Sequence, residues 1–120
     1  MDFLDKAKTE RLAAKEIVKL AKKAGYVDLE EKIKDGKIKI GDKIYAVNKN
    51  KAVVMFHIGS EDLSKGLAII GGHIDSPRLD LKPVPLIEEG GLAYLKTHYY
   101  GGVKKYNWTN IPLALHGVVF

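Results

Sequence analysis

The side chains whose types and spacing point most directly to chemistry are His73 and Asp75. On an extended backbone, residues two positions apart face the same side, so both side chains can reach one target. A neutral imidazole is a good zinc ligand, and a carboxylate that accepts its other ring N–H fixes the tautomer. His73 is therefore a candidate metal ligand, with Asp75 either orienting it or contacting a metal-bound water. The alternative is a hydrogen-bonded structural histidine, because His-x-Asp alone is a weak signal.

The segment around this pair is typical of an α/β site. Residues 67–70 have the composition of a buried strand that runs directly into Gly71 and Gly72. Two glycines remove side-chain bulk just before the two polar groups, and a Ser76-Pro77 turn follows. Functional sites of α/β sheets favour such strand ends. The pattern therefore predicts that the pair lies at a rigid but open place.

Upstream of the pair, the spacing of apolar residues predicts one amphipathic helix over residues 2–24. Asp2 is a candidate N-cap, and Gly25 stands where a left-handed residue commonly ends a helix. A short helical turn is expected at residues 29–34.

Strand patterns follow this helical region. Alternation of polar and apolar residues predicts a hairpin that pairs residues 37–40 with residues 43–47. Residues 52–58 are too continuously apolar for an edge strand, which indicates burial on both faces. The expected fold class is therefore α/β: an N-terminal helix with part of a mixed sheet.

Beyond Pro77 the character changes to β-like runs at residues 92–100 and 113–120, with a turn at residues 88–91. We place a domain boundary so that residues 1–81 belong to an α/β domain and residues 82–120 begin a β-rich one. The last run is apolar to its end, so we expect the chain to continue in a longer parent protein.

Composition narrows the function classes. The 120 residues are 46% hydrophobic and 29% charged, as in an ordinary globular domain. We expect a soluble, cytoplasmic protein, because neither a membrane span nor a secretory signal is evident. The chain has no cysteine, so any metal must be held by His, Asp or Glu. The net charge of +5 is spread thinly, which favours solvated lysines over a nucleic-acid surface.

A family resemblance appears in the residues that surround the pair. Residues 71–83, Gly-Gly-His-Ile-Asp-Ser-Pro-Arg-Leu-Asp-Leu-Lys-Pro, resemble the first zinc-site segment of the aspartyl aminopeptidase family. Residues 95–108 are similar to the segment that enters that family's second domain. The resemblance implies that residues 1–81 are part of the α/β catalytic domain and that residues 82–120 begin an inserted β-rich domain.

The resemblance also implies an activity. Members are dizinc exopeptidases that remove N-terminal residues, often acidic ones, from peptides; cobalt or manganese can substitute for zinc, and subunits assemble into a dodecamer. His73 matches a zinc ligand and Asp75 the catalytic aspartate that orients it. The remaining ligands and the general base would lie beyond Phe120, so the isolated 120 residues are expected to be inactive. The resemblance assigns no substrate-binding residue.

Two alternatives remain at this stage. The first is a small basic β-rich binding module without catalytic activity, with nucleic acid or a protein as partner. The second is another hydrolase of the same metal class, since related peptidases and deacylases also use His-x-Asp after a strand. The match through Pro83 argues against the second alternative.

The other histidines and the aromatic residues are better explained by structural roles than by chemistry. His57, His98 and His116 lie in strand-like segments and are predicted to be structural, with contact to a neighbouring subunit's site as the alternative for the last two. An aromatic cluster at residues 99–108 favours interface packing over base stacking.

Two basic residues follow the His-x-Asp pair. Arg78 and Lys82 are candidates for attracting an acidic substrate side chain. They are equally well explained as surface charges or as partners of Asp80.

Overall fold

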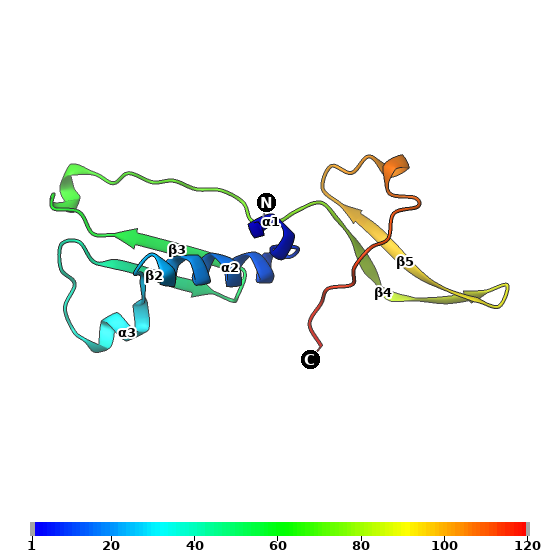
Figure 1. Ribbon diagram of the computed structural model, residues 1–120, viewed down its shortest axis with the longest axis horizontal. Helices are drawn as coiled ribbons and strands as arrows, with labels where there is room; N and C mark the ends of the chain where they lie inside the picture. The colour runs from blue at the N-terminus through cyan, green and yellow to red at the C-terminus, as the bar shows by residue number, and fades with distance from the viewer. Residues whose placement is uncertain (1, 120) are drawn as a thin grey trace. The chain divides into compact units, whose positions relative to one another are not determined.

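The computed structural model describes residues 2–119, and the chain divides into two compact units between Asp75 and Ser76 (Figure 1). The boundary predicted at residue 81 lies a few residues further on, inside strand β4 (Arg78–Glu89). Which boundary separates the domains of a longer protein stays a prediction. Within residues 2–119, no helix is long and apolar enough to cross a bilayer.

The N-terminal region forms two helices where the sequence predicted one. Helix α1 spans Asp2–Lys6 and α2 spans Glu10–Lys23. Thr9 between them is extended, with φ −135° and ψ 164°, and its Oγ1 accepts a hydrogen bond from Leu12 N at 3.2 Å. The single-helix prediction was wrong because this threonine caps a new helix. Asp2, predicted as an N-cap, is the first residue of α1 and pairs with Lys6 Nζ at 2.7 Å.

The core of the first unit lies between α2 and the sheet. Helix α2 packs against β2 (Lys43–Asn48) and β3 (Ala52–His57) (Figure 1). The buried residues of these elements are small on the helix and large on β2: Ala13, Ala14, Ala21, Ile44 and Tyr45. Gly25 has φ 83°, which confirms the predicted left-handed end of the helix.

A parallel pair and a short helix connect α2 to this sheet. Strand β1 (Val27–Asp28) pairs in parallel with β2, and α3 (Leu29–Lys34) follows as predicted. The Asp28 carboxylate caps α3 by accepting a hydrogen bond from Glu30 N at 2.9 Å.

The hairpin of the first unit lies later in the chain than predicted. Strand β2 pairs antiparallel with β3, from Lys43 opposite His57 to Asn48 opposite Ala52. Lys49 and Asn50, in the three-residue loop between the strands, have φ of 49° and 56°, and Lys51 N donates to Asn48 O at 2.9 Å to close a tight turn. The predicted partner, residues 37–40, is not a strand.

A polar cluster organises residues 37–42 instead of strand pairing. The Asp42 carboxylate accepts a hydrogen bond from Lys39 N at 2.7 Å and pairs with Lys32 Nζ at 2.9 Å. These two contacts, the backbone N–H first, hold the pKa of Asp42 below its ordinary value. The sequence analysis missed this cluster, because its members lie on α3 and on a loop.

Two strand predictions were wrong in a related way. The sheet order is β1-β2-β3, so β3 is an edge strand, and Val54 and Phe56 are each 49% exposed rather than buried. Residues 67–70 form no strand, and the Ile70 side chain is fully exposed. The first prediction assumed a strand on each side of β3, and the second assumed a strand beside residues 67–70. Among residues 2–119, β3 pairs with β2 alone and residues 67–70 pair with no strand.

The second unit is built on one long hairpin. Strand β4 pairs antiparallel with β5 (Leu92–Tyr100), and Gly90 and Gly91, with φ of 61° and 75°, make the turn. The strand predicted at residues 92–100 is confirmed, whereas the turn predicted at residues 88–91 is shorter than expected, because Glu88 and Glu89 still pair with β5. The register shifts between Leu81 and Leu86, where two prolines lack the N–H that a ladder needs.

The remainder of the second unit is largely irregular. A short helical turn, η2 (Lys105–Asn107), follows β5. Residues 113–119 form no strand, contrary to the prediction for residues 113–120, whose last member lies outside the described residues. The overall class is α/β, as predicted.

Candidate metal-ligand site

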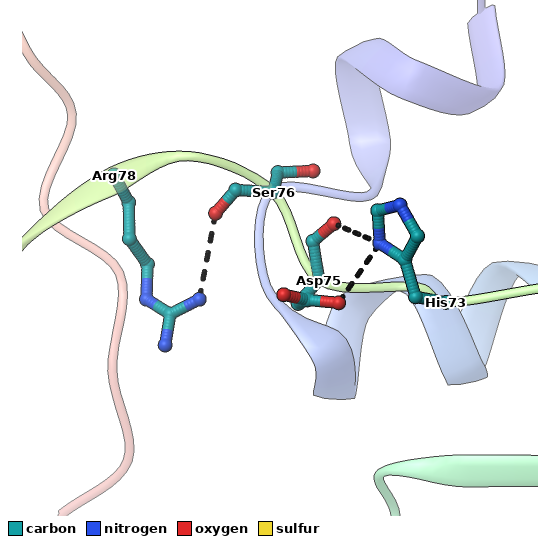
Figure 2. A network of polar contacts seen from close by, with 4 residues as sticks. All are labelled: His73, Asp75, Ser76 and Arg78. Carbon is teal, nitrogen blue, oxygen red and sulfur yellow. Dashed lines mark hydrogen bonds and ion pairs between the residues drawn. The ribbon is translucent and has the colours of Figure 1, made fainter. Parts of the chain in front are cut away.

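The predicted pair is brought together by a direct contact (Figure 2). His73 Nδ1 lies 2.9 Å from Asp75 Oδ1 and 3.2 Å from the Asp75 backbone oxygen. Both distances are within hydrogen-bonding range. The two-residue spacing therefore places the imidazole and the carboxylate in one local unit.

The contact also determines which ring nitrogen of His73 can bind a metal. An ionised carboxylate and a carbonyl oxygen can only accept hydrogen bonds, so in the neutral imidazole Nδ1 carries the proton. The lone pair then resides on Nε2, which Figure 2 shows on the side of the ring away from Asp75. A carboxylate that fixes the tautomer of a histidine in this way is a recurring partner of metal ligands.

The pair lies in the open. The His73 side chain is 84% exposed and that of Asp75 is 30% exposed. The predicted open place is thus present, but the predicted rigid strand before it is not. Gly71 and Gly72 have no heavy atom within 4 Å of where a side chain would begin, so no described neighbour requires a glycine there.

One ligand does not make a zinc site. No group of three or more His, Asp or Glu side chains that could hold a metal occurs among residues 2–119. Catalytic zinc takes about three protein ligands, so the described residues fit part of a site and not a whole one.

Arg78, three residues after Asp75, is engaged by residues of the second unit. Arg78 Nε donates to Asp80 Oδ1 at 2.7 Å, and its guanidinium lies 4.1 Å from the centre of the Tyr100 ring. Figure 2 shows its further hydrogen bond to the Ser76 backbone oxygen, at 3.5 Å. The interpretation of Arg78 as a partner of Asp80 is therefore confirmed.

The other three histidines are not gathered around a metal-binding group in the described residues. His57 ends the edge strand β3, opposite Lys43, in agreement with the prediction of a sheet-edge histidine. His98 stacks on Tyr99 with ring centres 5.1 Å apart. His116 lies in the irregular C-terminal segment.

The fold and the pair together define a class: an α/β chain with one exposed histidine whose Nδ1 is held by a carboxylate, as in many metal sites. The family model described as "Aminopeptidase I zinc metalloprotease (M18)" matches residues 3–120. The chain belongs to this M18 aminopeptidase family, which confirms the resemblance inferred from residues 71–83.

Individual relatives agree with this membership. The chain is 52% identical over 119 residues to a probable M18 family aminopeptidase 1 of Clostridium acetobutylicum, covering 98% of this chain and 26% of the relative. A probable M18 family aminopeptidase 1 of Thermotoga neapolitana is 52% identical over 120 residues, again over 26% of its length. The chain thus spans about a quarter of these relatives.

Solved structures show the same backbone. The crystal structure of aminopeptidase I from Borrelia burgdorferi B31 superposes with a TM-score of 0.81 and 43% identity, covering 89% of this chain and 26% of that one. An M18 aminopeptidase from Thermotoga maritima gives a TM-score of 0.81 and 48% identity over 93% of this chain and 24% of that one.

Proposed function

We propose that the full-length protein containing this chain is a zinc-dependent aminopeptidase that removes N-terminal residues from peptides, with His73 as a zinc ligand through Nε2. The contact of His73 Nδ1 with two oxygen acceptors of Asp75 carries the proposal, because it leaves Nε2 as the nitrogen with a lone pair. The family's zinc chemistry supports it.

The proposal gives the two residues different roles. His73 binds the metal, and Asp75 holds the imidazole in the required tautomer and orientation. When bound, zinc would polarise the scissile carbonyl and lower the pKa of a bound water. Two zinc ions are proposed, with cobalt or manganese able to replace them. The further ligands and the general base would come from the rest of the protein.

The finer properties belong to the same proposal. We propose a preference for acidic N-terminal residues, a homo-oligomeric, dodecameric assembly and a cytoplasmic location. No nucleic-acid or membrane partner is proposed. Family membership across residues 3–120 favours this peptidase over the small basic binding module considered from the sequence.

The test of the site uses the full-length protein with the variants His73→Ala and Asp75→Asn. We expect His73→Ala to lower the bound zinc, measured by mass spectrometry of the metal, and to abolish turnover. Asp75→Asn should keep most of the metal but reduce kcat by about 10–100-fold, as other outer partners of zinc ligands do. His57→Ala is the matched control, because this exposed histidine lies at the edge of β3.

Wild-type zinc content and turnover in the His73→Ala protein would contradict the site. The substrate preference is tested separately with glutamyl and leucyl 4-nitroanilides. A higher kcat/KM for the leucyl compound would reject the acidic preference while leaving the aminopeptidase activity and the role of His73 in place.

A further inference from the structure

The second unit contains a cavity that has no part in the proposed peptidase site. It has a volume of about 420 Å³ and lies between the β4–β5 hairpin and the segment that follows β5. Its principal lining side chains are Leu79, His98, Tyr99, Val103, Lys105 and Trp108. All belong to residues 76–119, so the cavity is a property of the second unit alone.

Two nitrogen-bearing side chains of this cavity converge on one ring. Lys105 Nζ lies 4.1 Å from the centre of the Tyr99 ring, and the His98 ring stacks on Tyr99 at 5.1 Å with an angle of 29° between planes. A cation over an aromatic face is held in place by the ring quadrupole. Lys105 and His98 are therefore each held against Tyr99, and all three side chains line the cavity.

The charge of this wall is not neutralised by its neighbours. Among residues 2–119, Lys105 makes no ion pair, and no aspartate or glutamate lines the cavity. Asp80, opposite His98 across the hairpin, is held by Arg78 at 2.7 Å. A ligand that enters the cavity thus meets a positive charge and hydrogen-bond donors without a competing carboxylate.

The remaining walls are suited to an apolar body. Leu79 and Val103 are aliphatic, Tyr99 and Trp108 offer aromatic surface, and the volume lies within the range of roughly 300–1,000 Å³ typical of small-molecule sites. A free amino acid fits poorly, because its ammonium would find no acidic partner there. The ligand that suits both the positively charged and the apolar parts of the cavity has one carboxylate and one apolar or aromatic group.

We propose that this cavity of the second unit binds small monocarboxylates with an aromatic or apolar body, with Lys105 as the partner of the carboxylate. The carboxylate pairs with Lys105 Nζ, and the body packs against Tyr99, Leu79 and Trp108. The site does not depend on the metal or on the peptidase activity.

The experiment measures binding of 3-phenylpropanoate and of its neutral amide, 3-phenylpropanamide, to the full-length protein by calorimetry. We expect the carboxylate to bind about tenfold more tightly than the amide, because a hydrogen bond to a charged group contributes more than a neutral one. Lys105→Met should remove this difference. Lys104→Met is the matched control, because the neighbouring Lys104 does not line the cavity.

Three results would overturn the proposal. The first is equal affinity for the carboxylate and the amide, or no binding of either. The second is the same loss in Lys104→Met and Lys105→Met, which would indicate a general charge effect. The third is loss of binding in a His73→Ala protein, because the carboxylate would then be bound at the metal site. Retained selectivity in His73→Ala together with its loss in Lys105→Met supports the cavity.

Discussion

Helix α2 lies within the helix predicted over residues 2–24, and residues 67–74 begin with the strand predicted over residues 67–70, but only the first of these predicted elements is regular in the structure. Helix α2 is capped by Thr9 and buries Ala13 to 1% exposure against the sheet. Residues 67–74 have no regular structure, and Ile70 is fully exposed. His73 is part of the second segment, so the candidate ligand lies on backbone that belongs to no helix or strand.

The difference follows from where each element finds its hydrogen-bond partners. A helix satisfies its backbone within its own sequence, and only its ends and one face need help. A strand satisfies its backbone only with another strand, which is often remote in the chain. Signals inside residues 9–25 therefore suffice for α2, whereas residues 67–74 depend on groups that lie elsewhere.

Among the substitutions that test the packing of helix α2, Ala13→Asp is expected to have the largest effect on stability. It places an unpaired carboxylate at a site that is 1% exposed, so we expect a loss of about 3–5 kcal/mol in the free energy of unfolding, or no cooperative transition at all. Urea titration followed by circular dichroism of the 120-residue chain measures it. Lys15→Asp, at an exposed position of the same helix, is the control, and equal losses in both variants would refute the assignment of this helix face to the core.

The second prediction concerns the cap of α2. Thr9→Ala removes the oxygen that accepts from Leu12 N and should lower the free energy of unfolding by about 1 kcal/mol. Thr9→Ser keeps the hydroxyl and should retain most of the stability in the same titration. If alanine and serine were equivalent, a continuous helix over residues 2–24 would be the better description.

The same contrast explains what could be predicted from the sequence. Gly25, α3 and the Gly90-Gly91 turn were predictable because each depends on residues close in the chain. The helix break was in principle readable from Thr9. The pairing of β2 with β3 was missed because the alternation at residues 37–40 predicted a hairpin with residues 43–47 instead.

The two candidate sites differ in the same way, because one depends on residues close in the chain and the other on remote residues. The His73–Asp75 contact was predictable, since a spacing of two residues is enough to create it. The cavity beside Lys105 was not, because it needs the register of β4 with β5 and the return of the chain after Tyr100. An aromatic cluster at residues 99–108 was the only sequence signal for it.

A smaller effect is expected at Asp42, which holds a loop through local contacts. Lys39 N–H and the Lys32 ammonium lower the pKa of this carboxyl, so its contribution to stability is present above the ordinary value of 3.8. That contribution is lost as the pH falls through the lowered pKa. Asp42→Asn should therefore be less stable than wild type at pH 7, and the gap should close towards pH 2. A gap independent of pH would mean that charge at Asp42 is unimportant.

The smallest effect in the 120-residue chain is expected from Ile70→Asp. Its side chain is fully exposed there, so the free energy of unfolding should change by less than about 0.5 kcal/mol. The same substitution in the full-length protein should cost several times more and reduce zinc binding, if remote strands cover residues 67–70 and thereby position His73. Urea titration and metal analysis of both proteins measure the two effects. Equal, negligible effects in both would show that residues 67–74 stay uncovered, and that His73 is positioned by its contact with Asp75 alone.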